Sequence, residues 1–191
     1  HAGPVDMIGV RFVPGAAPIF LDTPAAELTA NIIDARSIWT DVHELVEQLA
    51  SAEAQRRPAV FDRYLIAAMK IRRRDELALR AIGAIERSHG MLTVAALRES
   101  FNVSERTLQR SFSTSAGLTP KQMLRIMRFR NAVQLITAGR LPLAHVALLA
   151  GYTDQAHFTR EFRDLARTTP AAYARERAIV GFVQDGSTAP D

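Results

Sequence analysis

The sequence contains no cysteine among its 191 residues. This absence excludes disulfide scaffolds, cysteine zinc sites and thiol nucleophiles. Long apolar runs are also absent, because no stretch approaches the roughly 20 residues that a membrane-spanning helix requires. The opening residues, HAGPVDMIGV, lack the basic start and apolar stretch of a signal peptide, and they lack an initiator methionine. We therefore expect a protein without a membrane segment, whose chain begins partway through a longer gene product.

Catalytic and cofactor motifs are missing as well. The chain has no G-x-S-x-G, H-E-x-x-H, P-loop or G-x-G-x-x-G pattern. Its five histidines include no pair four residues apart, the spacing that places two metal ligands on one helical face. We therefore predict a protein that is not an enzyme and that holds neither a metal nor a cofactor.

Charge is unevenly distributed, although the formal net charge is only +4. Thirteen basic and six acidic residues lie between Met91 and Arg177, which gives that part +7 and leaves −3 for the rest. A basic segment of this kind indicates a polyanionic partner such as nucleic acid. A solvated basic face without a partner is the alternative that charge alone leaves open.

Two stretches of the C-terminal half match each other when the sequence is shifted by fifty positions. The matched residues are Ser104 with Asp154, Leu108 with Phe158, Arg110 with Arg160, Phe112 with Phe162, and AGLTP (116–120) with ARTTP (166–170). A match of helix start, apolar positions and terminator at one offset indicates a repeated supersecondary unit.

Each copy predicts a helix, a tight turn and a second helix. Ser104 and Asp154 are good N-caps, since their side chains can accept hydrogen bonds from the first helical turn. Asn102 and Gly151 lie just before them and tolerate the left-handed backbone of a tight turn. The expected helices are at about 93–100 and 104–114 in the first copy, and at about 143–150 and 154–165 in the second.

One long helix over 119–139 is expected to join the copies. Pro120 suits its first position, and Gly139 suits its end. A rigid connector would fix the distance between the second helices of the two copies. If both enter successive major grooves on one face of DNA, they must lie about 34 Å apart.

The second helix of the first copy has two different faces. Leu108 and Phe112 are four residues apart and point toward the core of the domain. Another stripe consists of Arg106, Gln109, Arg110 and Ser113, and its counterpart in the second copy consists of Ala156, Thr159, Arg160 and Arg163. Arginine can bond to guanine and glutamine to adenine through two atoms each, so this stripe favours base recognition. An ordinary amphipathic helix with a polar outer face is the alternative.

These residues resemble the AraC/XylS family of transcription regulators over about 77–177. The resemblance rests on VSERTLQRSF, the AGLTP after it, the long connecting helix and GYTDQAHFTREFRDLARTTPAAY. It implies a mainly α fold, with a seven-helix domain that holds two helix-turn-helix units in one monomer. The base contacts it implies are Arg106, Gln109, Arg110, Gln155, Ala156, Thr159 and Arg160. The phosphate contacts expected beside them are Ser104, Thr107, Arg128, His157 and Arg163.

The N-terminal part predicts a different organisation. Residues 9–20, GVRFVPGAAPIF, favour short strands broken by Pro-Gly, and two helices are expected at about 39–54 and 58–73. The resemblance implies that this part is the end of a sensor region whose helical pair, 39–73, is a candidate homodimer contact. Packing of the two helices on each other and on the strands is the alternative. We expect a linker near 70–77 and divide the chain into 1–74, 75–178 and a tail at 179–191.

The function expected from all of this is sequence-specific binding of double-stranded DNA by a bacterial transcription regulator of activator type. RNA polymerase is a candidate partner, the effector is not identified, and the expected location is the cytoplasm, at the nucleoid. The alternative is a ligand-sensing or protein-interaction module with a secondary or degenerate DNA-binding domain. The intact stripe of Arg106, Gln109 and Arg110 favours the regulator, since a degenerate domain should have lost those donors.

Overall fold

The computed structural model describes residues 8–12, 16–21, 23, 25–28, 31–69, 75–139 and 141–185. Within these residues the fold is helical and contains no strand, which confirms the predicted mainly α class. The chain divides into two compact units. The first unit comprises residues 1–82 and 101–120, and the second comprises residues 83–100 and 121–191.

The N-terminal part of the first unit consists of short helices followed by a helical pair. Its elements are α1 (Ala17–Phe20), α2 (Ala25–Leu28), the 3-10 helix η1 (Ala35–Ser37), α3 (Val42–Ser51), the 3-10 helix η2 (Ala54–Arg56) and α4 (Arg57–Ala68). The strands predicted for 9–20 are not found in the described part of that stretch. Residues 8–12 are irregular and α1 is a helical turn with a proline in its first turn, where the fixed φ of proline suits a helix.

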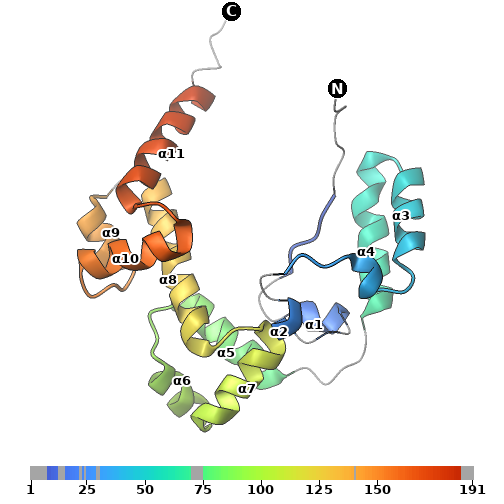
Figure 1. The fold of residues 1–191 in the computed structure, drawn as a ribbon, viewed down its shortest axis with the longest axis horizontal. Coiled ribbons are helices and arrows are strands. Elements are labelled where there is room, and N and C mark those ends of the chain that lie inside the picture. The colour runs from blue at the N-terminus through green and yellow to red at the C-terminus, as the bar shows by residue number, and fades with distance from the viewer. Residues whose placement is uncertain are drawn as a thin grey trace, which may run out of the picture. The chain divides into compact units, whose positions relative to one another are not determined.

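The predicted helical pair is present with shorter bounds, as α3 and α4, which pack against each other (Figure 1). Val42 and Leu45 of α3 and Val60 and Leu65 of α4 are buried. Val46, the residue after Leu45 on α3, is 59% exposed. The expected linker lies partly outside the described residues, which resume at residue 75.

Seven helices follow within residues 75–185, as the resemblance implied. They are α5 (Glu76–Arg87), α6 (Val94–Phe101), α7 (Glu105–Ala116), α8 (Pro120–Thr137), α9 (Leu143–Leu149), α10 (Gln155–Ala166) and α11 (Pro170–Asp185). The long connecting helix predicted for 119–139 is α8. It starts at Pro120 and ends before Gly139, whose φ of +66° lets the chain leave the helix.

Gly90, in the turn after α5, allows that turn to approach the backbone of α8 closely. Its φ is +78°, and a Cβ atom at this position would lie 2.4 Å from the carbonyl oxygen of Leu124 and 2.7 Å from the amide nitrogen of Arg128. Any side chain would therefore clash with backbone atoms of α8, which cannot move aside as a flexible side chain could. Glycine at this position thus holds the turn against α8.

The core of the second unit joins α8, α9, α10 and α11. Its buried residues are Ala132, Ile136, Val146, Ala147, Ala150, Tyr152, Phe158 and Phe162. Phe162 lies at the centre of an aromatic group, with its ring centroid 4.9 Å from that of Phe129 and 5.6 Å from those of Phe158 and Tyr173. These contacts anchor α10 through its apolar face and leave its other face outside.

Candidate nucleic-acid interface

Helix α7 begins as its sequence predicts. Asn102 in the turn before it has a φ of +50°, in the left-handed region that asparagine tolerates. The Ser104 side chain then accepts a hydrogen bond from the backbone N–H of Thr107 at 3.1 Å. The two hydroxyl groups, of Ser104 and Thr107, also lie 2.9 Å apart. This cap satisfies one of the free amides of the first turn and fixes where the helix starts.

The two faces of α7 are also as predicted. Leu108 and Phe112 are completely buried, at 0% exposure. The residues of the other stripe, Arg106, Gln109, Arg110 and Ser113, are all exposed. The amide of Gln109 donates to the carboxylate of Glu105 at 3.1 Å, so its orientation is set by a neighbour one turn earlier. An exposed row of two guanidinium groups and an amide can reach the edges of bases.

Helix α10 repeats this start. Gly151 takes a φ of +80°, and the Asp154 side chain accepts a hydrogen bond from the backbone N–H of His157 at 2.6 Å. Phe158 and Phe162 are at 0% exposure, as Leu108 and Phe112 are in the first copy. The same construction therefore appears in both copies, from cap to buried face.

The outer face of α10 carries as many strong donors as that of α7, at different positions along the helix. Gln155, Ala156, Arg160 and Arg163 are exposed. Thr159 is half-buried, and its hydroxyl donates to the carbonyl oxygen of Gln155 at 2.8 Å. Its methyl group and the lone pairs of its hydroxyl oxygen are therefore left for contact with a base. Two arginines and one glutamine are the strong donors on this face.

The helix ends of the two copies differ in one residue. Gly117 follows α7 with a φ of +66°, and its N–H donates to the carbonyl oxygen of Ser113. Arg167 follows α10 with a φ of +59°, and its N–H donates to the carbonyl oxygen of Arg163. The residue that ends the helix is therefore in the left-handed conformation in both copies, although it is not glycine in the second.

A group of charged residues between α8 and α10, which we call the Glu161 cluster, was missed by sequence reasoning. Glu161 Oε1 lies 3.2 Å from Arg125 Nε and 3.7 Å from His157 Nε2, and Glu161 Oε2 lies 3.6 Å from Arg128 Nη2. Asp164 adds an ion pair with Arg125 at 2.8 Å. Glu161 is only 16% exposed, so the pairs are partly shielded from water. One signal was available: His157 and Glu161 are four residues apart, which places them on one face of the helix.

Arg128, predicted to contact phosphate, is engaged inside the protein. Besides Glu161, its guanidinium donates to the carbonyl oxygen of Gly90 at 3.4 Å and lies 5.9 Å from the centroid of the Tyr152 ring. Burial raises the pKa of Tyr152 to about 12, with the charge of Glu161 adding to the effect, so the phenol stays neutral near pH 7. A phosphate contact by Arg128 requires the guanidinium to leave these partners.

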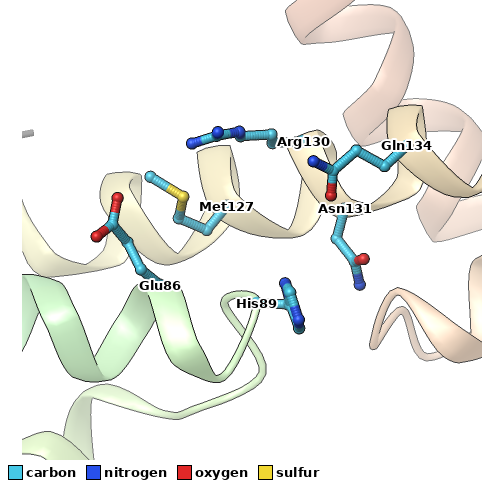
Figure 2. A pocket seen from close by; sticks show the side chains of 6 residues that line it. All are labelled: Glu86, His89, Met127, Arg130, Asn131 and Gln134. Atoms are coloured by element: carbon cyan, nitrogen blue, oxygen red, sulfur yellow. The ribbon is translucent and has the colours of Figure 1, made fainter. Parts of the chain in front are cut away.

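A small cleft of about 210 Å³ lies between the end of α5 and α8 (Figure 2). Glu86 and His89 line it from one side, and Met127, Arg130, Asn131 and Gln134 line it from α8. Glu86 and Arg130 bring one negative and one positive charge to the lining, so the cleft offers a phosphate no net positive charge.

Among the described residues, no group of three or more acidic, histidine or cysteine side chains could hold a metal ion. Nor does any helix among them have the length and apolar character needed to cross a membrane.

Comparisons with known proteins match this part of the chain. A family model described as a helix-turn-helix domain matches residues 97–176. The ornithine utilization regulator of Pseudomonas aeruginosa is 41% identical over 72 residues, which are 38% of this chain and 21% of that protein. The transcriptional activator RhaS of Escherichia coli is 32% identical over 89 residues, which are 47% of this chain and 31% of that protein. The chain thus spans under a third of the length of these relatives.

Two solved structures share the fold. The C-terminal domain of AraT, a response regulator from Geobacillus stearothermophilus, has a TM-score of 0.51 and 26% identity, and the match covers 53% of this chain and 85% of that one. A transcriptional regulator with an AraC-type DNA-binding domain from Chromobacterium violaceum has a TM-score of 0.50 and 23% identity, covering 53% and 92%. At that identity the second likeness concerns the fold alone.

Proposed function

We propose that this chain, whose residues 97–176 match a helix-turn-helix family model, is an AraC-type regulator that binds specific DNA sequences through α7 and α10 and regulates transcription. One observation carries the proposal beyond the family. Two capped helices, fifty positions apart, each bury a pair of large apolar side chains and leave arginine and glutamine outside. A helix of this kind inserts its outer face into a major groove, where each base pair shows a distinct pattern of donors and acceptors.

The proposed contacts divide into two groups. On α7, Arg106, Gln109 and Arg110 read base edges. On α10, the base contacts are Gln155, Ala156, Thr159 and Arg160, of which Ala156 offers only a methyl group, suited to thymine. Side chains close to the caps and at the outer edges hold the backbone of the duplex, which positions the protein without reading sequence. The proposed phosphate contacts are Ser104, Thr107, His157 and Arg163, whereas Arg128, the fifth residue expected from the sequence, is paired with Glu161 instead.

Selection of binding sites from a random pool of duplexes tests this proposal. Two conserved blocks about one helical turn apart are expected if both helices read bases from one monomer. A single block would mean that α10 mainly holds the backbone. No enrichment by the folded protein at low salt would favour the alternative, a ligand-sensing or protein-interaction module with a degenerate DNA-binding domain.

Removal of one base-reading arginine should weaken specific binding. We expect Arg106→Ala or Arg110→Ala to cost about 1–3 kcal/mol on the selected site and to relax preference at one or two base pairs. Titration of selected and scrambled duplexes at one salt concentration measures both effects. Arg56→Ala is the matched control, since Arg56 is also an exposed arginine and lies on η2, outside the proposed interface. If both variants bind the two duplexes as the parent does, α7 is not the reading helix.

Salt dependence should separate the arginines that face DNA from those held inside. Each phosphate contact adds about 1 to the slope of log K against log salt concentration, through counterion release. Arg163 is exposed, so Arg163→Ala should lower the slope by about 1. Arg128→Ala should weaken binding with a smaller change of slope, because it loosens the support of α10 through Glu161. Equal loss of slope in both variants would show that Arg128 leaves Glu161 to reach a phosphate.

Further proposals concern partners other than DNA and the organisation of the chain. We propose RNA polymerase as a partner, which a regulator of activator type would meet beside its DNA site. Exposed Val46 on α3 and Ile66 on α4, at 59% and 70%, are apolar positions available for the homodimer proposed for 39–73. We also propose that the chain is organised as 1–74, 75–178 and 179–191, and that it acts in the cytoplasm.

A further inference from the structure

The first unit contains a cleft that the DNA interface does not use. It lies between α1, the residues around η1, and α4, and its volume is about 390 Å³. Its lining residues are Phe20, Ile38, Trp39, Thr40, Asp41, Tyr64, Ala67 and Ala68. A cleft of this size falls within the range of small-molecule sites.

Aromatic rings form two sides of this cleft. The rings of Trp39 and Tyr64 meet edge to face, with centroids 5.4 Å apart and planes at 80°. The indole N–H of Trp39 donates to the carbonyl oxygen of Phe20 at 3.0 Å, which ties the end of α1 to this corner. Trp39, Tyr64 and Phe20 all line the cleft, and the face of an aromatic ring attracts a cation.

Asp41 supplies a carboxylate at the same place. It stands at the N-cap position of α3, yet its side chain makes no capping hydrogen bond. Instead, Asp41 Oδ1 accepts from the hydroxyl of Tyr64 at 2.7 Å. Among the described residues, no cationic side chain is found within ion-pair distance of Asp41. In the part of the chain that the structure describes, the carboxylate at the cleft therefore has one neutral donor and no positive partner.

The electrostatic surroundings are negative around Tyr64 as well. Burial raises the pKa of Tyr64, and the hydrogen bond to Asp41 and the negative charges of Asp41 and Glu44 raise it further. The phenol therefore stays neutral throughout the physiological range. An anionic ligand would be repelled by the carboxylate of Asp41 in the lining and by the charge of Glu44 near Tyr64. A neutral ligand would leave the charge of Asp41 without a cation.

We propose that this cleft binds a small organic ammonium ion, held beside the rings of Trp39 and Tyr64 and paired with Asp41. A cation over an aromatic face is attracted by the ring quadrupole, and more strongly where water is partly excluded. The carboxylate adds charge attraction, and Phe20, Ala67 and Ala68 cover the apolar part of the ligand. Nothing in the DNA-reading function requires these three features together.

The position of the cleft connects it to α7. Phe20 is the last residue of α1, and α1 and α2 both pack against α7 within the first unit. Ser111 and Ser115 of α7 are buried. A ligand that contacts Phe20 therefore acts on elements that support a proposed reading helix, and any effect on DNA affinity must be matched by an equal effect of DNA on ligand affinity. That coupling rests on the proposed function, whereas binding to the cleft does not.

Trp39 is the single tryptophan of the chain, so its fluorescence reports on this cleft directly. The whole chain is titrated with choline and, separately, with 3,3-dimethyl-1-butanol, a neutral molecule of the same shape. Choline should change the fluorescence of Trp39 saturably, with a dissociation constant on the order of 1–10 mM, and the neutral molecule should not. Equal responses to both molecules, or no saturable response to choline at about 100 mM, would overturn the proposal.

Two substitutions test the role of the carboxylate. Asp41→Asn should raise the dissociation constant of choline at least about tenfold, while Asp62→Asn, an exposed aspartate of α4 outside the lining, should leave it unchanged. Tyr64→Phe keeps the ring and frees the carboxylate, so binding should persist or tighten. Unchanged binding by Asp41→Asn, or its loss in folded Tyr64→Phe, contradicts the proposal. Thermal melting without ligand checks that each variant is folded.

DNA affinity is then measured with and without choline. A shift of DNA affinity by choline in the parent, absent in Asp41→Asn, supports the route through α1. Choline binding by a protein that fails to bind any DNA would leave the cleft intact and defeat the proposed function. DNA binding without choline binding would overturn the proposal for the cleft and leave the proposed function intact.

Discussion

Replacing Leu108 with aspartate should unfold the part of the first unit that carries α7. Leu108 is at 0% exposure, so the change removes a buried apolar side chain and puts a charge in its place. Loss of such a side chain alone costs about 2–5 kcal/mol, and an unpaired buried carboxylate costs several more. The total, on the order of 5 kcal/mol or above, equals much of the 5–15 kcal/mol that stabilises an ordinary domain. Circular dichroism during heating and urea titration measures the loss.

Ser113→Asp provides the matched control for this experiment. Ser113 lies on the same helix but is exposed, so the same charge stays in water there. The change should cost no more than about 1 kcal/mol, mainly because a negative charge is unfavourable near the C-terminal end of a helix. If Leu108→Asp melted like the parent, the buried face of α7 would be assigned wrongly, and the reading face with it.

Replacing Phe162 with alanine should have the second largest effect, on the second unit. The ring is at 0% exposure and contacts the rings of Phe129, Phe158 and Tyr173. Truncation of such a residue costs about 3–5 kcal/mol, partly for lost apolar contact and partly for the cavity left behind. The midpoint of urea unfolding should fall accordingly. The part of the DNA site that α10 reads should no longer be bound.

Phe162→Leu is the informative comparison. It keeps most of the volume and should cost only about 1 kcal/mol, so DNA recognition by α10 should survive. A similar loss in both variants would mean that the aromatic contacts themselves, rather than filled space, hold α10. A negligible loss in the alanine variant would contradict the position of Phe162 in the core.

Local signals in the sequence predicted the parts of the fold that depend on nearby residues. Ser104 and Asp154 cap their helices, and Asn102 and Gly151 take the left-handed backbone, because each acts on a few neighbouring residues. The spacing of Leu108 and Phe112 identified the buried face of α7 for the same reason. The predicted reading helices, 104–114 and 154–165, differ from α7 and α10 by one or two residues at their ends, as helix termini commonly do.

Features that depend on how distant segments meet could not be predicted in this way. Arg125 and Asp164 are 39 positions apart, and their ion pair exists only because α8 and α10 pack together. The cleft at Trp39 likewise needs Tyr64, from another helix, beside it. The strands predicted for 9–20 failed because β-branched and aromatic residues indicate a strand only where a partner strand exists. The described residues supply none.

The left-handed residue after each reading helix makes the two copies unequal in their motions. Gly117 adopts its conformation without steric cost, whereas Arg167 carries a side chain whose Cβ crowds the following carbonyl, at about 1 kcal/mol. A difference of that size corresponds to a roughly fivefold larger population of frayed conformations at the end of α10. The last turn of α10 is therefore the looser of the two. Binding of a duplex along α10 would therefore have to order the last turn of that helix, whereas the end of α7 needs less ordering.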